Sequence, residues 1–242
     1  LNAITTNGLD EHTLVIFTSD NGPWLSYGTH AGSTGPLREG KGTSWEGGVR
    51  VPCVMRWPGT IPAGTVCEDP GMHIDLLPTL ARLIGADLPE KTIDGRDLFP
   101  LIAGAEGAGN PHESYWIYYK QNELHAILKD GWKLILPHRY RSLDGKKGGD
   151  GGVPVPYRNL DTGMALYHLD EDISEAGDLA ATHPEKVAEL LKEAEAARTE
   201  LGDALTKREG TGRREPGRLS EEEGAALDKI LWPAGRPVER KR

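Results

Sequence analysis

The chain has 242 residues, enough for one large domain or for a medium domain with a smaller one, and its formal net charge is −9. This acidic balance argues against a nucleic-acid partner held by phosphate contacts, and no apolar stretch reaches the roughly 20 residues needed to span a bilayer. With 37% apolar residues, 31 glycines and 17 prolines, the composition indicates a loop-rich globular protein rather than a helical bundle.

The two cysteines, Cys53 and Cys67, fit no metal-binding spacing and make no disulfide framework. We expect two free, buried thiols rather than a single bridge. The first residue is Leu1 and no signal region is visible, so we expect the native protein to begin upstream. The missing targeting segment then carries no information about location.

The first strong signal along the chain is a continuous apolar run at residues 14–18. Its valine, isoleucine and phenylalanine favour a strand, and a run that is apolar on both faces is typical of a buried strand in a parallel sheet. The run stops at the turn signal of residues 19–23. Asp20 and Asn21 should therefore lie at the carboxyl end of a central strand, the edge where ligands bind in open α/β sheets.

A glycine-rich loop region follows and leads into a second apolar strand at residues 53–57. Residues 75–85 predict a helix because their leucines follow helical spacing, with Asp75 as the cap and Gly85 as the stop. The glycine-rich stretch at residues 104–109 is typical of a domain boundary.

The remaining sequence predicts an antiparallel sheet of about four strands. The four segments are residues 115–119, 124–128, 132–136 and 165–169. A hairpin turn at residues 129–131 joins the second strand to the third. A helix should follow Pro184, with Thr182 and Glu185 as a capping box, and should cover this sheet. From residue 206 onward we expect a polar tail, with a short last helix capped by Ser220 together with Glu223.

Two groups of polar residues carry the chemistry. Asp20 and Asn21 offer a carboxylate and an amide carbonyl, hard oxygen donors suited to Ca²⁺ or Mg²⁺, although Asp-Asn-Gly is also a common turn. Lys41 stands between Gly40 and Gly42, whose small size lets an anion approach the ammonium and the nearby backbone N–H groups. The alternative for Lys41 is an ordinary solvated loop lysine.

Two competing motifs fail in their context. Residues 35–41 match the G-x-x-x-x-G-K pattern of a phosphate-binding loop, but Gly42 follows where Ser or Thr is needed, and no strand leads directly into the motif. Residues 170–178 resemble a calcium loop, but Glu175 stands at its sixth position, where glycine is required.

The two polar groups, in this order, resemble the sulfatases of the arylsulfatase type, members of the alkaline-phosphatase-like superfamily. SDNGPW at residues 19–24 is followed by a loop and by LREGKGTSWEGGVRVPCVMRWPG at residues 37–59, which is highly similar to the arylsulfatase pattern. Weaker similarity continues in order through residues 73–86, 94–104, 130–140 and 165–180. The resemblance covers nearly the whole chain up to about residue 205.

The resemblance implies an α/β fold. Residues 1–103 would form part of an alkaline-phosphatase-like sandwich with a mostly parallel sheet. Residues 104–205 would form a small α+β C-terminal domain with a four-stranded antiparallel sheet and a packed helix. Residues 206–242 would be the polar tail with its short helix.

The resemblance also implies roles for individual residues. The aspartate and asparagine of the motif bind the divalent cation, usually calcium, a role that carries over to Asp20 and Asn21. The lysine of the GKG segment contacts the sulfate, a role that carries over to Lys41. A substrate contact from His138 is a further hypothesis, and a hairpin histidine hydrogen-bonded locally is the favoured alternative.

The family's nucleophile is a formylglycine made from the Cys or Ser of a C/S-x-P-x-R motif, which precedes the Asp-Asn segment. Neither cysteine of this chain fits that motif, and the family's paired aspartates, its sulfate-binding histidines and its second lysine are also not found. We therefore expect this chain to be the C-terminal portion of a sulfatase, with the N-terminal half as its missing partner, and to be inactive alone. Exported relatives imply a periplasmic or secreted location.

The leading prediction is a hydrolase of sulfate esters, with sulfated carbohydrates as one possible substrate class. A phosphodiesterase or phosphonate hydrolase with the same metal site is the rival within the superfamily. A non-catalytic binding fragment is the rival from a different class.

Overall fold

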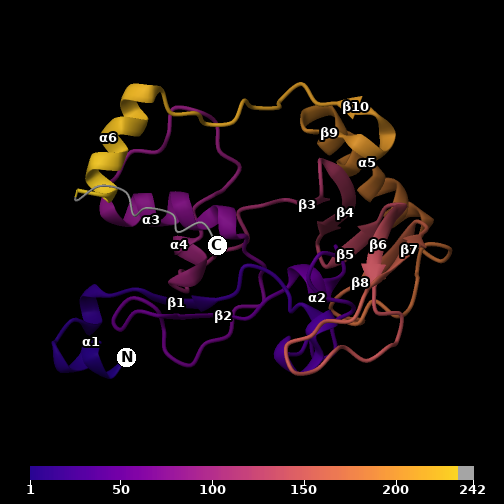
Figure 1. The fold of residues 1–242 in the computed structure, drawn as a ribbon, viewed down its shortest axis with the longest axis horizontal. Helices are drawn as coiled ribbons and strands as arrows, with labels where there is room; N and C mark the ends of the chain where they lie inside the picture. Colours follow the sequence, from indigo (N-terminus) through magenta and orange to yellow (C-terminus); the bar gives the residue numbers. More distant parts are fainter. Residues whose placement is uncertain (234–242) are drawn as a thin grey trace.

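The computed structural model describes residues 1–233, and the end of the predicted tail lies outside the described residues. Helices and strands alternate with long loops (Figure 1). In chain order the helices are α1 (Asn2–Thr6), α2 (Glu46–Val49), α3 (Leu76–Ile84), α4 (Phe99–Ile102), α5 (Pro184–Glu200) and α6 (Glu221–Leu231). The strands are β1 (Val15–Thr18), β2 (Cys53–Arg56), β3 (Tyr115–Tyr119), β4 (Glu123–Lys129), β5 (Trp132–Ile135), β6 (His138–Ser142), β7 (Arg158–Thr162), β8 (Ala165–His168), β9 (Gly202–Asp203) and β10 (Arg208–Glu209). Short 3₁₀ turns include η2 (Leu25–His30) and η3 (His73–Asp75).

The two apolar runs near the N-terminus form strands, but they pair antiparallel. Val15 lies opposite Arg56 and Thr18 opposite Cys53. The prediction of a mostly parallel sheet is wrong for the described residues, where every named strand pair is antiparallel. Within this part of the chain β1 has one hydrogen-bonded neighbour, so its Phe17 side chain is 69% exposed rather than buried.

Both cysteines are free, as predicted, but both are exposed rather than buried. Cys53 belongs to β2, the edge strand of the two-stranded sheet, and Cys67 lies in the irregular segment that follows it. No helix among residues 1–233 combines the length and apolar character that a bilayer crossing demands.

Helix α3 begins after η3 and ends at Gly85, whose φ of 66° is the left-handed conformation expected of a glycine stop. Asp75 occupies the predicted N-cap position of this helix, but its side chain makes no capping hydrogen bond there. Its fully buried carboxylate instead accepts hydrogen bonds from the backbone N–H groups of Met72 and Arg96, both at 2.8 Å, and from Nε2 of His112 at 2.7 Å. Asp75 thus ties together three segments that are distant in sequence.

The four predicted strand segments of the second half form one antiparallel sheet in the order β3-β4-β5-β8. The predicted turn between β4 and β5 is confirmed, with Lys129 opposite Trp132 and a two-residue loop between them. Asp130 and Gly131 have φ values of 49° and 75°. Positive φ at both positions matches the right-handed twist of the flanking strands.

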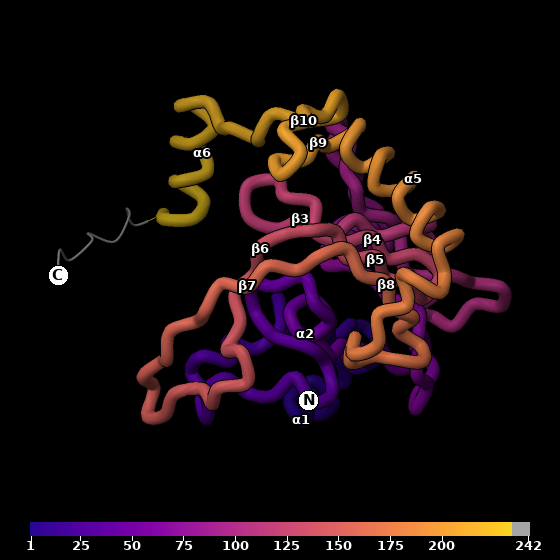
Figure 2. The backbone as a smooth tube through the Cα atoms, turned by 90° about the vertical axis from the view of Figure 1, so that its right-hand side faces the viewer, coloured from indigo at the N-terminus to yellow at the C-terminus, as the bar shows by residue number. Residues whose placement is uncertain are grey.

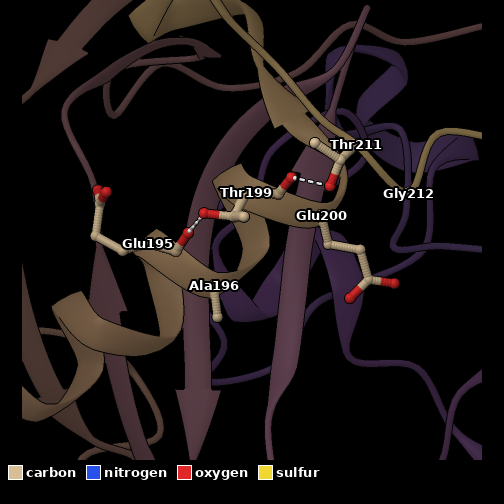
Figure 3. A pocket seen from close by; sticks show the side chains of 6 residues that line it. All are labelled: Glu195, Ala196, Thr199, Glu200, Thr211 and Gly212. Atoms are coloured by element: carbon tan, nitrogen blue, oxygen red, sulfur yellow. Dashed lines mark hydrogen bonds between the residues drawn. The ribbon is translucent and has the colours of Figure 1, made fainter.

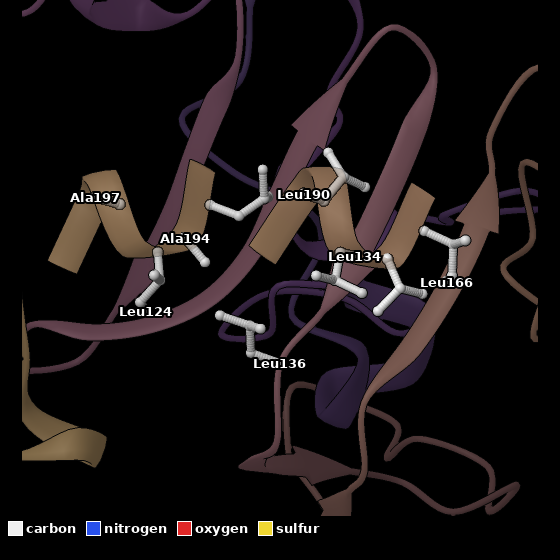
Figure 4. Packing of buried hydrophobic residues seen from close by; sticks show 9 residues of the cluster. Leu124, Leu134, Leu136, Leu166, Leu190, Ala194 and Ala197 are labelled. Carbon is white, nitrogen blue, oxygen red and sulfur yellow. The ribbon is translucent and has the colours of Figure 1, made fainter. Parts of the chain in front are cut away.

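Helix α5 covers one face of this sheet, as predicted (Figure 4). The buried cluster between them consists of Leu124, Ile127, Leu134, Leu136, Leu166, Val187, Leu190, Ala194 and Ala197. Pro184 is the first residue of the helix, but the predicted capping box is wrong. Thr182 Oγ donates to the carbonyl of Leu179 at 3.0 Å, and His183 occupies the N-cap position without a side-chain cap.

The opposite face of the sheet is covered by the glycine-rich loop that contains α2, so the order of layers is helix, sheet and loop (Figure 2). Trp45 is the loop's main anchor and is only 1% exposed. Its indole makes edge contacts with the rings of Tyr140 and Tyr167, at centroid distances of 5.6 and 5.9 Å. The guanidinium of Arg38 lies 3.6 Å from the indole centroid. Aromatic burial therefore fixes the loop to the sheet.

A fully buried ion group adds to this anchor. The Nζ atom of Lys133, on β5, lies 2.8 Å from Oε1 of Glu46 in α2 and 2.9 Å from Oε1 of Glu175. The contact with Glu46 is a hydrogen bond, whereas the contact with Glu175 is an ion pair without hydrogen-bond geometry. Oε2 of Glu175 accepts the backbone N–H of Glu46 at 2.7 Å. Burial raises the pKa of Glu175, because a carboxylate withdrawn from water holds its proton more tightly.

The first part of the predicted polar tail, after α5, is held by backbone hydrogen bonds. β9 pairs with β10, and the N–H groups of Thr211 and Gly212 bond to carbonyls near the end of α5, enclosing a shallow depression (Figure 3). An extended segment then crosses to α6, at the α3 end of the molecule (Figure 1). The capping box of Ser220 with Glu223 is confirmed by hydrogen bonds of 3.2 and 2.8 Å.

Replacing the buried lysine should be strongly destabilising. Lys133→Met leaves the carboxylates of Glu46 and Glu175 buried without their shared cation, which should lower the free energy of unfolding by roughly 3–5 kcal/mol. Urea unfolding measures this, with Lys192→Met on the exposed face of α5 as the matched control. A triple variant with Lys133→Met, Glu46→Gln and Glu175→Gln should regain much of the loss. A Lys133→Met protein as stable as wild type would contradict the role of the ion group.

Candidate functional site

The structure brings together the two polar segments that the sequence singled out. The backbone N–H of Gly22 donates to the carbonyl of Gly48 at 3.0 Å, and the backbone N–H of Lys41 donates to the carbonyl of Pro23 at 2.9 Å. The turn that carries Asp20 and Asn21 is thus joined, main chain to main chain, to the loop that carries the candidate anion-binding lysine.

Glycines permit this close approach. A Cβ atom on Gly22 would lie 1.7 Å from the carbonyl oxygen of Gly47, and one on Gly40 would lie 2.6 Å from the carbonyl oxygen of Pro23. Both distances are shorter than non-bonded atoms tolerate, so any side chain here would force the two segments apart. The small residues of both motifs are therefore needed for the geometry of the site.

Asp20 and Asn21 follow β1 directly, in a turn where Ser19 Oγ donates to the carbonyl of Asn21 at 2.9 Å. Asp20 is exposed and Asn21 half-buried, and neither side chain makes a hydrogen bond or ion pair within residues 1–233. Two uncommitted hard oxygen donors fit a divalent cation such as Ca²⁺. The described residues contain no group of three or more His, Cys, Asp or Glu side chains arranged to hold a metal, so these two donors would be part of a larger ligand set.

Lys41 is half-buried and its main chain is held on both sides. Its N–H is bound to Pro23, and its carbonyl accepts Nε and Nη2 of Arg141 at 2.9 and 2.5 Å. The ammonium lies 5.8 Å from the ring centroid of Trp24, and no carboxylate within the described part of the chain pairs with it. An unpaired ammonium near an aromatic ring, on a fixed main chain, is suited to an anionic ligand.

His138 lies elsewhere. Its ring is 5% exposed, Nδ1 bonds to the carbonyl of Leu136 at 2.7 Å, and Nε2 is buried without a partner among residues 1–233. No contact with Asp20, Asn21 or Lys41 is present. The local hydrogen bond agrees with the favoured alternative, and a substrate contact from His138 stays a prediction.

The His138 ring stacks on His125 at a centroid distance of 3.7 Å. His125 in turn connects the sheet to the loop, because its Nδ1 lies 3.0 Å from Ser44 Oγ and its Nε2 lies 2.9 Å from Glu123 Oε2. Since the carboxylate accepts only, Nε2 carries the proton and Nδ1 accepts from the Ser44 hydroxyl when the ring is neutral. Ser44 is 1% exposed, so this chain of hydrogen bonds positions the loop rather than offering a nucleophile.

Sequence reasoning missed Arg141, His125 and Lys133. A lysine inside the apolar run of β5 was the signal for a buried charge, since strand alternation places Lys133 on the same face as Ile135. For His125 and Arg141 no local pattern distinguished them from surface residues. Their partners, Ser44 and Lys41, lie 81 and 100 residues away in sequence.

The mixed α/β fold of the described residues is similar to the fold of solved sulfatase structures. The sulfatase family model matches residues 1–86, and the chain belongs to the sulfatase family. It is 49% identical over 219 residues to arylsulfatase A of Homo sapiens, covering 85% of this chain and 41% of that protein. It is 46% identical over 212 residues to steryl-sulfatase of Mus musculus, covering 81% of this chain and 34% of that protein.

Solved structures agree with this assignment. The sulfatase PsFucS1 of Pseudoalteromonas sp. superposes with a TM-score of 0.68 at 26% identity, covering 81% of this chain and 38% of that one. The chain therefore spans well under half the length of the relatives it matches.

We expect the free energy of unfolding to fall at acid pH because of the two stacked histidines. Burial lowers the pKa of His138 to about 4 and lowers the pKa of His125 as well. A histidine with a depressed folded-state pKa contributes stability that is present above its unfolded pKa, about 6.5, and is lost as the pH falls toward the folded value. His138 alone should account for about 3 kcal/mol between pH 6.5 and pH 4.

The measurement is the free energy of unfolding against pH for wild type, His138→Leu and the exposed-residue control His30→Leu. His138→Leu should flatten the profile between pH 6.5 and 4, whereas the control should keep it. Identical slopes in all three proteins would contradict the prediction. The same His138→Leu variant tests the substrate contact, since unchanged kcat and KM in the native enzyme would exclude it.

Proposed function

We propose that this chain is the C-terminal portion of a sulfuric ester hydrolase of the arylsulfatase type. The observation that carries the proposal is the hydrogen bond from the N–H of Lys41 to the carbonyl of Pro23, which joins the main chain of this unpaired lysine to the turn that carries Asp20 and Asn21. An ammonium and two hard oxygen donors in adjacent, rigidly joined segments suit a substrate anion and its cation.

In this proposal Lys41 binds the sulfate group and stabilises negative charge that develops on its oxygens as the ester bond breaks. Asp20 and Asn21 supply two ligands of a divalent cation, Ca²⁺ or Mg²⁺. When bound, that cation would supply further charge neutralisation for the sulfuryl group. The formylglycine nucleophile and the other cation ligands would come from the part of the protein outside this chain, and the chain alone would be inactive.

Sulfated carbohydrates are the substrate class that we propose. A related structure, Ps i-CgsB, was solved in complex with k-i-k-neocarrahexaose and superposes with a TM-score of 0.62 at 26% identity, covering 96% of this chain and 44% of that one. Trp24, 44% exposed, and Tyr27 form an edge contact at 5.1 Å beside Lys41, and aromatic rings of this kind stack well on sugars. By the same family relation we propose an exported enzyme, periplasmic or secreted.

Lys41→Ala should lower kcat/KM for an aryl sulfate by roughly 10²–10³-fold in the complete native enzyme, because it removes a charge that acts on the transition state. The matched control is Lys192→Ala, an exposed lysine on α5. The 242-residue chain assayed alone should show no turnover. An unaffected Lys41→Ala enzyme would refute the role of this lysine, and faster turnover of a phenyl phosphonate than of the sulfate would favour the phosphoryl rival.

Removal of the cation should cause a reversible loss of activity, and the affinity for the cation should depend on Asp20. EGTA should abolish activity, and added Ca²⁺ should restore it. Asp20→Ala should weaken Ca²⁺ binding by roughly tenfold or more, because the loss of a direct metal ligand should cost at least as much as the loss of a residue that orients one. Calorimetry on the native enzyme measures this affinity. Asp87→Ala, another exposed aspartate, is the control. Equal Ca²⁺ affinity in wild type and Asp20→Ala would remove Asp20 from the ligand set.

A further inference from the structure

Arg141, on β6, holds the main chain of the candidate sulfate-binding lysine. Its Nε and Nη2 atoms both donate to the carbonyl oxygen of Lys41, at 2.9 and 2.5 Å, across a separation of a hundred residues. Two bonds that converge from a planar guanidinium on one oxygen restrain the orientation of the guanidinium as well as its distance. Since the N–H of Lys41 is already bound to Pro23, the main chain of this residue is restrained on both sides.

The guanidinium of Arg141 is not committed to a carboxylate within the described part of the chain. Its Cζ atom lies 4.7 Å from the ring centroid of Tyr157 and 5.8 Å from that of Trp24. Its neighbours on the hairpin differ: Arg139 pairs with Asp161 at 3.6 Å, and Arg158 pairs with Asp144. Arg141 therefore contributes a positive charge next to Lys41, over the same indole ring that the Lys41 ammonium faces.

Gly42 makes room for this contact. Its φ is 84°, and a Cβ atom placed on it would lie 2.4 Å from Nη2, 2.5 Å from Cζ and 2.5 Å from Nε of Arg141. The two glycines of the GKG segment are therefore each required, but for different physical reasons. Gly40 admits the backbone of Pro23, whereas Gly42 admits the guanidinium of Arg141.

We propose that Arg141 is a positioning residue for sulfate recognition, which holds Lys41 in its binding geometry through the space that Gly42 leaves open. The inference rests on the proposed role of Lys41. A lysine side chain has four rotatable bonds, so its ammonium is placed accurately only if its main chain is fixed. A displacement of about 1 Å at a reacting group can cost roughly 10²-fold in rate.

The test compares Arg141→Met, Arg141→Lys and the control Arg139→Met in the complete native enzyme, each alone and combined with Lys41→Ala. We expect Arg141→Met to lower kcat/KM for an aryl sulfate by roughly 10–100-fold. Arg141→Lys should behave similarly, because an ammonium keeps the charge but cannot form the fork. Arg139→Met, two residues away on the same strand, should be unaffected. In the Lys41→Ala background Arg141→Met should cause little further loss, because it acts through Lys41.

Gly42→Ala provides an independent arm. It should reproduce the loss seen in Arg141→Met, and the double variant should lose no more than either single one. The proposal is overturned if Arg141→Met is as active as wild type, if Arg141→Lys retains full activity, or if the Arg141→Met loss is undiminished without Lys41. An unaffected Lys41→Ala enzyme would instead refute the proposed function itself, so the two failures are distinguishable. Thermal midpoints of all variants separate a loss of positioning from a loss of folding.

Discussion

Lys133 is buried between Glu46 and Glu175, and the rest of the site depends on this contact. Because an uncompensated buried charge is costly, the three side chains stabilise the fold only when α2 of the loop, β5 of the sheet and the segment around Glu175 come together. Trp45, one residue before Glu46, is buried by the same docking. The loop can therefore dock on the sheet in only one position. In that position Lys133 meets both carboxylates and the Trp45 ring is buried.

The docked position of the loop determines where the side chains of the candidate site lie. With this part of the loop fixed, the carbonyl of Lys41 meets Arg141 of β6, while the glycines that follow Glu46 meet the turn after β1. The close main-chain approaches at Gly22 and Gly40 follow from this docking, since each glycine faces a backbone oxygen of the opposite segment. Partners distant in sequence thus hold the part of the loop between residues 38 and 48.

Local patterns in the sequence predicted the elements better than their partners. The strands β3, β4, β5 and β8, the turn at Asp130 and the stop at Gly85 follow from short-range rules of apolar runs and backbone conformation. The direction of β1 did not, because a four-residue apolar run carries no information about which strand it pairs with. Asp75 stands at the predicted N-cap of α3, but its carboxylate does not cap that helix, since it accepts from Met72 just before it and from the distant Arg96 and His112.

In the candidate site, too, local patterns predicted the residues but not their distant partners. Asp20, Asn21 and Lys41 could be found from residue type and spacing, because oxygen donors and a cation between glycines indicate ion binding by themselves. Arg141 could not, because its role depends on a contact between β6 and a loop a hundred residues earlier. The Lys41 ammonium comes from the loop and the Arg141 guanidinium from β6, and each lies 5.8 Å from the ring centroid of Trp24. Under the proposed function, anion recognition by this chain would be coupled to folding, since Lys41 and Arg141 are brought together only when the loop has docked on the sheet.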